Sequence, residues 1–570
     1  MFTFRQSHCS RRVDCLPFRK LSVALAVAAL SGQALAFDIP LDDPDLKLRW
    51  DNTLRYNLGI RAEKQDAAIL ANSSYDESDA KFKRGNIVMN RLDLLTEADL
   101  VFKGRSGLRV SAAAWADQAY NNTEVKTGPG LQGTGSYPGD QYTSGTKRWY
   151  RGPSGEVLDA FAFVGFDAGT MPVNIRLGQH TVYWGESLFS FVHGVSYSQG
   201  PIDVRLASAT PGISAKELFK PVPQLSGTVQ LNEQLSVAAQ YIFRWKGSTL
   251  PYGGTYFGAL DAISSGGTYL INPAVAAALG AAGPAPYAAS LGDPEKRGDW
   301  GIMARWTPDL LKGGTAGFYF RKYTDSLPQL VSAGFQAAPN APGGVIPTAF
   351  GLSYRPGSQR ATLVGASLSG SVSGVSVAGE IAHRSNGGLL MGGGTTFGTE
   401  PVGDTWHALA NAIAYFGSNP LWDAAALTTE VAYSRLDKVK KNAGNFNSFD
   451  HASFGCSAGT LGCATKDAWS IAAKFEPTWY QPLPGVDLSM PVIYTRGISG
   501  TSPVLFGGYE GSGTYSLGLN ATVKEKYILT LAYNDSFAKH KVAGGVVTEI
   551  GGIGAQWDRG WVSLTVKADF

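Results

Sequence analysis

The stretch WVSLTVKADF, from Trp561 to Phe570, decides the fold class of this chain. Apolar and polar residues alternate through it: Val562, Leu564, Val566, Ala568 and Phe570 against Ser563, Thr565, Lys567 and Asp569. Successive side chains of a strand point to opposite faces. The stretch therefore predicts a β-strand with one apolar face, one face suited to water, and an aromatic last residue.

The N-terminal segment has the features of a secretory leader. Its basic residues come first: Arg5, Arg11, Arg12, Arg19 and Lys20. An apolar run follows from Leu21 to Leu30, and Ala34-Leu35-Ala36 provides an A-x-A cleavage site before Phe37. The apolar run has about ten residues, whereas a bilayer-spanning helix needs roughly 20, which disfavours the alternative of an anchor helix. We therefore predict a signal peptide at 1–36 and a mature chain at 37–570.

Charge and cysteine usage fit an exported protein. The chain has 49 Lys and Arg against 46 Asp and Glu, and the leader carries five of the basic residues but only one acidic residue. The mature chain is close to neutral, so nothing indicates binding to nucleic acid. Outside the leader only Cys456 and Cys463 remain, and they predict a small disulfide-closed loop in an oxidising compartment. A zinc site is the weaker alternative, because only His451 lies nearby.

Alternation like that of the last strand recurs along the chain, and after the leader no apolar run is long enough for a helical span. RLDLLTEADL (91–100) and LRVSAAAWAD (108–117) alternate on either side of the turn KGRSG, which predicts a hairpin. Its charged face must line a lumen, since an Arg or Lys at mid-bilayer costs roughly 2–4 kcal/mol. The lumen-lining candidates are Arg49, Arg55, Arg91, Asp93, Glu97, Asp99, Arg109, Asp117, Arg176 and His180. These charges either brace the wall as a paired ladder or set up a transverse field that orients solutes.

Tight turns and long polar segments follow one another along the chain. Further hairpin turns centre on 166–172, 232–233, 308–314, 370–374 and 524–526. Longer Gly- and Pro-rich segments lie at 61–85, 120–156, 247–297, 325–358, 385–401 and 437–466. This asymmetry predicts an all-β, transmembrane antiparallel barrel of the outer-membrane type. About nineteen candidate strands can be counted, and a bacterial single-chain barrel has an even number, so we expect 18 strands, with 16 to 20 as the plausible range. The aromatic residues expected in girdles near strand ends are Trp149, Tyr150, Trp245, Trp300, Trp306, Trp406, Trp479, Tyr480, Trp557 and Trp561.

One segment interrupts the strand pattern between Arg176 and Leu225. It carries the run Trp184 to Ser187, several prolines, and a predicted short helix near 214–220 that Pro221 and Pro223 end. About forty residues without a strand pattern must fold inward as a plug or constriction, or outward as a lid. We place this insertion at 185–222 and expect specificity to lie there. Its candidate residues are Trp184, Glu186, Asp203, Lys216 and Glu217.

The same segment resembles the signature of an uncharacterised proteobacterial family, domain of unknown function 1302. The resemblance rests on Arg176–Gln179, Trp184–Ser187, Pro201–Val204, Pro211-Gly212, Lys216-Glu217 and Pro221–Leu225. It implies an outer-membrane β-barrel without established functional residues. It also implies a genetic neighbourhood with a second outer-membrane-associated protein and an RND-type transporter, in catabolism of sterols, aromatics or other hydrophobic compounds. The last strand resembles the closing strand of such barrels, in which the final aromatic, here Phe570, helps the barrel-assembly machinery recognise its client.

Catalytic signatures are weak. Gly455-Cys456-Ser457-Ala458-Gly459 matches G-x-S-x-G, but that chemistry needs a strand–elbow–helix context rather than a disulfide-closed loop. The histidines show no metal-binding spacing, and no phosphate loop or dinucleotide fingerprint occurs. We expect no enzyme activity, no cofactor and no metal. The acidic run Asp76, Glu77 and Asp79 is expected to be a solvated face rather than a calcium site.

The favoured function is an outer-membrane channel, surrounded by lipid and lipopolysaccharide, that passes small, poorly water-soluble organic compounds. Sterol-, aromatic- or lipid-like solutes would move past the insertion, and an RND-type transporter would work with the channel. The alternative is a non-conducting barrel that anchors a periplasmic or outer-membrane partner in lipid or envelope transport. An outer-membrane hydrolase that uses Ser457 is a weaker third hypothesis.

Overall fold

The computed structural model describes residues 37–39, 41–132, 135–209, 215–261, 263, 269–270, 285–292, 298–337, 345–353, 360–392, 395–448, 450 and 456–570. The predicted signal peptide, 1–36, and His451 lie outside these residues. The wall is formed by β2 (Leu46–Arg61), β3 (Ile87–Phe102), β4 (Ser106–Asp117), β5 (Ser154–Ala168), β6 (Met171–His180), β7 (Val222–Gln230), β8 (Leu235–Ile242), β11 (Asp299–Trp306), β12 (Thr315–Tyr323), β15 (Ala361–Val372), β16 (Val375–Gly388), β17 (Val402–Phe416), β18 (Ala424–Lys441), β19 (Asp467–Leu483), β20 (Val486–Ser489), β21 (Val492–Ser499), β22 (Gly513–Val523), β23 (Tyr527–Phe537) and β26 (Trp561–Asp569).

Shorter elements accompany the wall. The remaining strands are β1 (Phe37–Ile39), β9 (Tyr269–Leu270), β10 (Ala285–Gly292), β13 (Gln329–Ala337), β14 (Val345–Ser353), β24 (His540–Ala543) and β25 (Val546–Ile550). The helices are α2 (Ala67–Leu70), α3 (Asp76–Lys81), α4 (Ser144–Thr146), α5 (Val204–Ala209) and α6 (Ala215–Leu218). The 3-10 and π turns are η1 (Gln118–Tyr120), η2 (Pro138–Asp140), η3 (Lys147–Arg151), η4 (Asp309–Leu311) and η6 (Ala443–Asn445). No helix in the described part of the chain has the length and apolar character needed to cross a bilayer.

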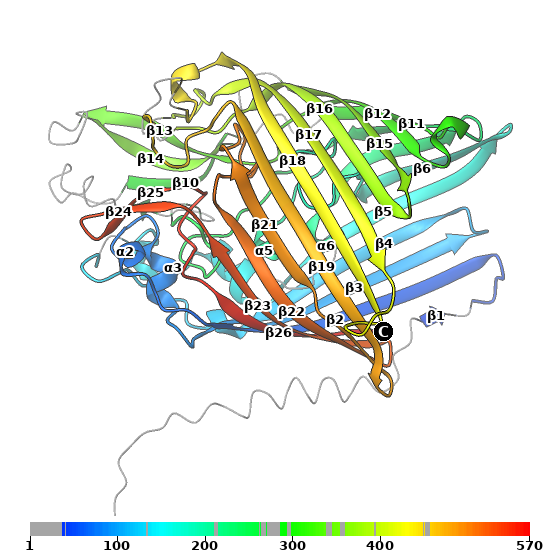
Figure 1. Ribbon diagram of the computed structural model, residues 1–570, viewed down its shortest axis with the longest axis horizontal. Coiled ribbons are helices and arrows are strands. Elements are labelled where there is room, and N and C mark those ends of the chain that lie inside the picture. The colour runs from blue at the N-terminus through cyan, green and yellow to red at the C-terminus, as the bar shows by residue number, and fades with distance from the viewer. Residues whose placement is uncertain are drawn as a thin grey trace, which may run out of the picture.

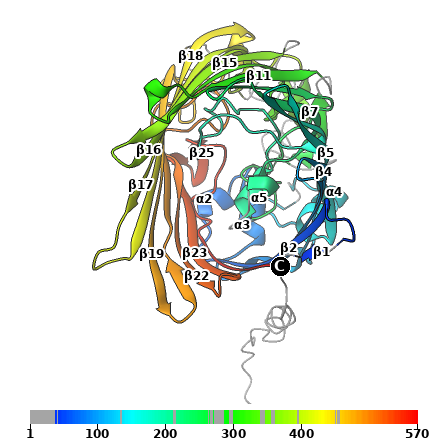
Figure 2. The same ribbon diagram turned by 90° about the vertical axis from the view of Figure 1, so that its right-hand side faces the viewer.

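The wall is a closed antiparallel barrel of 18 strands, as the sequence predicts. β20 and β21 follow one another between β19 and β22 and count as one strand of the wall. The barrel closes where β26 pairs with β2, from Thr53 opposite Asp569 to Arg61 opposite Trp561. Phe570 extends this seam, because its N–H donates to the carbonyl of Asn52 at 2.8 Å. Figure 2 looks into the resulting ring.

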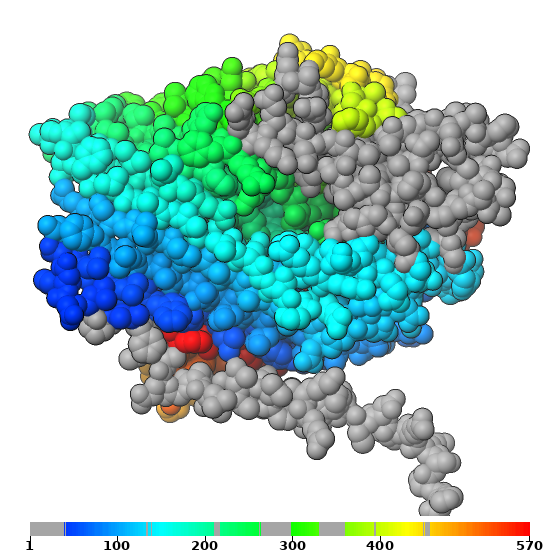
Figure 3. All heavy atoms as spheres, turned by 180° about the vertical axis from the view of Figure 1, so that it is seen from behind, coloured from blue at the N-terminus to red at the C-terminus, as the bar shows by residue number. Residues whose placement is uncertain are grey.

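The two faces of the wall differ as the alternation requires. Apolar side chains stand exposed on the outer face, among them Leu92, Leu94, Leu108, Val110, Val364, Leu368, Leu517 and Leu531. Charged residues in the same strands, such as Arg91, Asp93 and Glu97, are buried on the inner face. β3 and β4 form the predicted hairpin, with Arg91 opposite Asp117 and Asp99 opposite Arg109. The N-terminal strands form successive blue, cyan and green bands on the side of the barrel shown in Figure 3.

The two ends of the barrel are unlike. Short turns join the strands at one end, where Lys103, Gly104, Gly169, Ser373, Gly374 and Lys524 adopt positive φ. At the other end lie α2, α3, the hairpin of β24 and β25, and the separate sheet of β9, β10, β13 and β14 (Figure 1). The disulfide between Cys456 and Cys463 forms as predicted, in the long connection between β18 and β19, with a Cα–Cα distance of 5.9 Å.

The aromatic girdle is only partly where the sequence places it. Trp306, Trp406 and Tyr480 are exposed on the outer face. Tyr150, Trp245 and Trp561, in contrast, are buried. Trp149 stacks on Trp115 with ring centroids 5.1 Å apart. The girdle prediction is wrong for these residues, because each packs against a loop or insertion that covers the inner face, where a strand-end position alone gives no information.

Candidate functional site

The long insertion between β6 and β7 lies inside the barrel. Figure 2 shows α5, which belongs to it, within the ring. β6 ends at His180 and β7 begins at Val222, and these two residues are direct partners across the strand pair. The chain therefore leaves and rejoins the wall at one point, and residues 181–221, here named the inserted segment, start four residues earlier than the predicted 185–222.

Two wall carboxylates hold the inserted segment by its backbone N–H groups. Glu380 of β16 accepts hydrogen bonds from the N–H groups of Glu186, Ser187 (3.1 Å) and Val195 (2.6 Å). Glu430 of β18 accepts from those of Leu188 (2.7 Å), Phe189 (3.1 Å) and Ser190 (2.5 Å). Hydrogen bonds to an ionised acceptor are shorter and stronger than neutral ones. The two glutamates therefore act as a clamp on the main chain.

Wall arginines hold the carbonyl groups of the same stretch. Arg321 of β12 donates to the carbonyl oxygens of Val195 at 2.9 Å and Tyr197 at 2.7 Å. Arg384 of β16 donates to the carbonyl of Gly194 at 2.9 Å and lies 4.1 Å from the centroid of the Tyr197 ring. Because these contacts use the backbone, they fix the path of the chain and leave its side chains free to face the lumen or the wall.

A pair of buried histidines joins the inserted segment to β17. His193 Nδ1 lies 3.0 Å from His407 Nδ1, His193 Nε2 lies 2.9 Å from the carbonyl of Gly507, and His407 Nε2 lies 2.9 Å from the Thr405 hydroxyl. A carbonyl only accepts, so His193 carries its proton on Nε2 and accepts at Nδ1 from His407. Both rings are then neutral. Burial, helped by Arg384, lowers the pKa of His193 to about 4.

The other side of the inserted segment is tied to the first strands. Arg55 of β2 forms an ion pair with Glu217 of α6, with nitrogen–oxygen distances of 2.8 and 3.3 Å. Asp203 pairs with Arg205 at 2.7 Å and lies 3.7 Å from Lys220, which also contacts Glu156 of β5. Contacts to β2 and β5 on one side and to β16 and β18 on the other show that the inserted segment crosses the lumen.

The remaining predicted insertion residues have different surroundings. Trp184 is buried in a cluster with Val192, Val195, Tyr319 and Leu363. Glu186 takes part through its backbone, because its carbonyl also accepts from Asn411 at 2.6 Å. Lys216 lies on α6 next to Glu217.

The predicted lumen charges of β3 and β4 form a paired ladder. Arg109 contacts Glu97, Asp99 (2.7 Å) and Asp159 (3.5 Å), and Arg91 pairs with Asp93 at 2.8 Å. Asp117 accepts from the N–H groups of Asn90 and Ala119. Arg49 pairs with Asp51 at the exposed start of β2. This arrangement matches the bracing interpretation.

Arg176 and His180 of β6 differ from the ladder. His180 is buried and its Nε2 lies 2.7 Å from the Ser226 hydroxyl, which makes it a hydrogen-bonded part of the wall. Arg176 is exposed, lies 5.7 Å from the centroid of the Phe161 ring, and has no ion-pair partner among the described residues. It lines a cavity of about 600 Å³, the inner vestibule, with Asp99, Arg109, Phe161, Phe163 and Asn174 beside the short turns.

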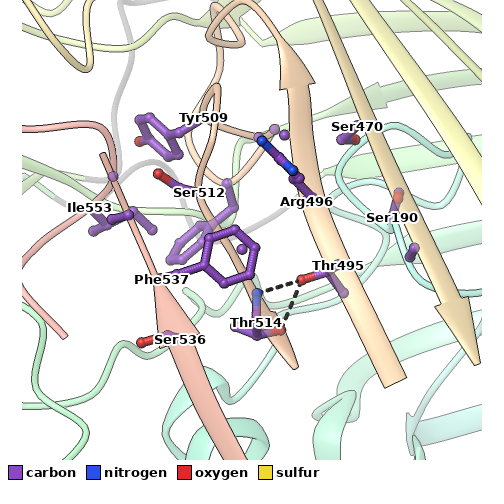
Figure 4. Close-up of a pocket in the computed structure, with 18 of the residues that line it drawn as sticks. Ser190, Ser470, Thr495, Arg496, Tyr509, Ser512, Thr514, Ser536, Phe537 and Ile553 are labelled. Atoms are coloured by element: carbon purple, nitrogen blue, oxygen red, sulfur yellow. Dashed lines mark hydrogen bonds between the residues drawn. The ribbon is translucent and has the colours of Figure 1, made fainter. Parts of the chain in front are cut away.

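A second cavity, the outer cavity, has a volume of about 350 Å³ and lies against residues 189–193 of the inserted segment. Figure 4 shows part of its lining, with Ser470, Thr495, Arg496, Tyr509, Thr514 and Phe537 contributed by the wall and by the 500–512 loop. The outer cavity is mostly apolar. The inner vestibule lies beside the short turns and the outer cavity lies beside the 500–512 loop, towards the other end of the barrel, and the inserted segment crosses the lumen.

Sequence reasoning missed the residues that hold the inserted segment: Arg321, Glu380, Arg384, His407 and Glu430. Each is a single polar residue in a largely apolar alternating strand, as Glu380 and Arg384 are in VSVAGEIAHRS, residues 375–385. A lone inward carboxylate requires a partner, since buried polar groups are almost always hydrogen-bonded. That requirement could have marked these positions, although it could not have identified backbone N–H groups as the partners.

The prediction of a solvated face for Asp76, Glu77 and Asp79 is wrong, because all three are buried under the outer loops. The loop between β2 and β3 folds over the barrel, and Asp79 pairs with Arg61 at 2.9 Å and with Arg559 at 3.0 Å. Burial, followed by the charge of Asp261, raises the pKa of Asp76 to about 8 and that of Glu77 well above its usual value. Burial raises the pKa of Asp261 to about 7.

Catalytic and metal chemistry find little support. Ser457 lies in an exposed loop with its hydroxyl 3.0 Å from that of Thr460. In the described part of the chain, His383, Asp404 and Asp437 are the one group whose ligand atoms lie close enough to share an ion. Asp404 already pairs with Lys440 at 2.8 Å, which offsets its charge.

The family described as "Protein of unknown function (DUF1302)" matches residues 18–570, and the chain belongs to it. No curated protein matches the sequence. Among solved structures, OprD of Pseudomonas aeruginosa is 11% identical with a TM-score of 0.37, covering 94% of this chain and 99% of that one. OccAB2 of Acinetobacter baumannii is 9% identical with a TM-score of 0.41, covering 92% and 98%. OpdK of Pseudomonas aeruginosa, solved with vanillate, is 8% identical with a TM-score of 0.39, covering 92% and 98%.

Proposed function

We propose that this DUF1302 barrel is an outer-membrane channel for small, poorly water-soluble organic compounds, of sterol-, aromatic- or lipid-like character. The observation that carries the proposal is the inserted segment, which crosses the lumen between the outer cavity and the inner vestibule. A segment held by four wall charges, Arg321, Glu380, Arg384 and Glu430, is a constriction of fixed shape. Solutes that pass it must fit the space that the segment leaves.

The route would be passive. Aromatic side chains of the outer cavity, including Phe189, Phe191 and Phe506, would first take up the apolar solute from the outside. Arg176 and Phe161 of the inner vestibule would offer the next contact, through charge and ring stacking. A barrel of this kind has no energy source in its own structure. Net accumulation would therefore depend on a partner, for which an RND-type transporter is the proposal that accompanies the family resemblance.

Location and assembly follow from the same proposal. The apolar outer face suits the lipid and lipopolysaccharide of the bacterial outer membrane. Removal of 1–36 as a signal peptide would deliver the chain to the periplasm, and the aromatic end of β26, Phe570, would serve as the signal for the barrel-assembly machinery.

A second function has one observation in its favour. The contacts that hold the inserted segment are numerous and buried, as in the cluster of Trp184, Val195 and Tyr197. A lumen filled in this way suits a non-conducting barrel that anchors a periplasmic or outer-membrane partner in lipid or envelope transport.

Solute uptake into proteoliposomes distinguishes a channel from a non-conducting partner barrel. Vesicles that contain the mature chain should take up labelled aromatic and alicyclic carboxylates faster than protein-free vesicles, and faster than they take up a sugar of similar mass. A partner protein would give no uptake above that of protein-free vesicles, and it would co-purify with a second envelope component.

A further inference from the structure

The inner vestibule brings a guanidinium and two aromatic rings together on the lumen-facing side of the wall. Arg176 of β6 is opposite Phe163 of β5, and Phe161, two positions earlier on β5, is opposite Gly178. Directly opposed residues of an antiparallel strand pair share one face of the sheet. Leu177, between Arg176 and Gly178, is an exposed apolar residue of the outer face. One ligand in the lumen can therefore contact Arg176 and both rings.

The Phe161 ring lies next to the guanidinium of Arg176, with the guanidinium carbon 5.7 Å from the ring centroid. Gly178 has no side chain to cover this ring. It has a φ of 130°, and an added Cβ there would clash with the carbonyl oxygen of Ala160. An arginine that lies over a ring keeps its N–H groups available in the plane of the guanidinium. The ring can therefore orient Arg176 while its hydrogen-bonding fork remains free for a ligand.

The carboxylates that line the inner vestibule are already engaged. Asp99 accepts a hydrogen bond from Arg109 at 2.7 Å, and Asp167 accepts one from Arg105 at 2.6 Å. Arg176 has neither an ion pair nor a hydrogen bond from its guanidinium among the described residues. Of the charged groups that line this cavity, Arg176 is the one that the described chain leaves for an external anion. A guanidinium binds a carboxylate through two parallel hydrogen bonds.

The ladder of β3 and β4 has more carboxylates than arginines, but it lies away from Arg176. Three carboxylates share Arg109: Glu97, Asp99 and Asp159. Arg109 is on β4, two strands from β6, and two strand spacings amount to roughly 10 Å, which is about one Debye length at physiological salt. The excess negative charge of the ladder is therefore largely screened at Arg176, where the contacts are local.

Asn174 adds a second polar group on the same face of β6. It is two positions from Arg176, is exposed, and its side-chain amide has no hydrogen-bond partner among the described residues. A carboxylate held by a guanidinium has further lone pairs that an amide N–H can use. Phe161 and Phe163, with ring centroids 6.3 Å apart, offer apolar contacts for a ring. The volume of about 600 Å³ is that of a pocket for a small organic molecule.

We propose that the inner vestibule is a binding site for aromatic carboxylates, with Arg176 binding the carboxylate, Asn174 donating to it, and Phe161 and Phe163 contacting the ring. This inference rests on the proposed channel function and narrows its substrate class from poorly water-soluble compounds in general to those with one anionic group. The same positive charge would also attract an inorganic anion such as phosphate, and the test separates the two.

Three probes of one shape test the preference for charge: 2-naphthoate, 2-naphthylmethanol and 2-naphthylmethylamine. Their binding to the purified mature protein in lipid nanodiscs is measured by calorimetric titration, with empty nanodiscs as the blank. The carboxylate should bind about ten times more tightly than the alcohol, and the cationic amine should bind most weakly. Equal affinities, or tightest binding of the amine, would overturn the proposal. Displacement of 2-naphthoate by an equal concentration of inorganic phosphate would also overturn it, because the site would then select only charge.

Substitution of Arg176 tests the carboxylate contact. Arg176→Gln should lower the affinity for 2-naphthoate about tenfold, which corresponds to about 1.4 kcal/mol, and leave that for the alcohol unchanged. Arg176→Lys keeps the charge without the fork and should restore only part of the loss. The matched control is the Arg105→Gln, Asp167→Asn double variant, which removes an ion pair from the same cavity without changing its net charge. Normal binding by Arg176→Gln, or an equal loss in the control, would reject the assignment of Arg176.

A further variant tests the contact with the ring. Phe163→Leu keeps an apolar side chain opposite Arg176 but removes the aromatic face. It should lower the affinity for 2-naphthoate several-fold, since aromatic pairs contribute roughly 0.5–1.5 kcal/mol beyond the area that they bury. An unchanged affinity would contradict the placement of the ring against Phe163.

The uptake assay keeps this inference separate from the channel function. Uptake of 2-naphthoate into proteoliposomes without Arg176-dependent binding would leave the channel intact and reject the vestibule site. Arg176-dependent binding without uptake would retain the site and reject the channel. Heat-modifiable migration in gel electrophoresis establishes in each case that the variant barrel is folded.

Discussion

The carboxylate of Glu380 on β16 accepts a hydrogen bond of 2.6 Å from the backbone N–H of Val195, which lies in the segment inserted between β6 and β7. The two residues are 185 positions apart in the sequence. The contact joins the middle of the inserted segment to the wall opposite its point of departure, so the position of the segment in the lumen depends on a few wall side chains.

The glutamate clamp should control the order of the inserted segment. In the Glu380→Ala, Glu430→Ala double variant, six backbone N–H groups lose their acceptors, and each orphaned buried group costs about 1–3 kcal/mol. Amide hydrogen exchange of residues 186–195 should become at least tenfold faster, while the barrel strands keep their protection. Glu476→Ala is the control, because Glu476 pairs with Lys474 instead. Unchanged exchange in the double variant would show that side-chain packing alone fixes the segment.

The buried acids of the outer loops should make those loops less stable as pH rises. The pKa of Asp76 is raised to about 8 and that of Asp261 to about 7, against 3.8 for the unperturbed group. The folded loops bind the protons more tightly than the unfolded loops do, so their stability is full below about pH 4 and is lost as pH rises through 7 and 8.

Limited trypsin digestion of residues 62–86 should therefore be faster at pH 8.5 than at pH 6, after correction for the pH dependence of the protease. The Asp76→Asn, Asp261→Asn double variant should flatten this dependence. Cleavage that slows at the higher pH in the wild type would contradict the assignment of protonated carboxyls.

The histidine pair should give the opposite pH dependence in the lumen. The pKa of His193 is lowered to about 4 from its ordinary 6.5, so the unfolded segment binds the proton more readily. The stabilising contribution of the pair is full above about pH 6.5 and is lost as pH falls towards 4. Arg384 on the neighbouring strand disfavours the charged ring further.

Protection factors of residues 190–197, corrected for intrinsic exchange, should therefore fall between pH 7 and pH 4.5 in the wild type. A His193→Gln variant lacks one of the two rings of the pair and should show lower protection that depends less on pH. Identical pH profiles in both proteins would exclude His193 as the titrating group.

Local alternation predicted the barrel, because it is a property of each strand on its own. β3, β4 and β26 could be recognised from a few residues each, and short turns such as that at Asn232 separate them plainly. The strand number followed from a count of the candidate strands and from the even number that bacterial barrels have. Contacts between segments that are distant in the sequence could not be predicted from this local alternation. Glu430 meets Leu188, 242 positions away, and Asp79 meets Arg559, 480 positions away.

The predictions that were wrong concern residues that a remote segment of the chain buries. An acidic run is usually solvated, but Asp76, Glu77 and Asp79 are covered by loops from other parts of the chain. Trp561 occupies a strand end, as a girdle residue would, yet it packs against Gly59 and Met89 on the inner face. The local pattern of apolar and polar residues does not indicate which residues a remote segment will bury.

The measurement that tests the central claim most directly is the conductance of the mature chain in planar bilayers, compared with a variant in which 181–221 are replaced by Asn-Gly. His180 and Val222 are paired residues, so a two-residue type I′ turn should join β6 to β7 without strain. Removal of the β24–β25 hairpin, which lies at the long-loop end of the barrel and packs on α2 through Val547, is the control. We expect the Asn-Gly variant to conduct several times more current than the wild type and the hairpin control. Equal currents, or silence from all three proteins, would contradict the view that the inserted segment is the constriction of a channel.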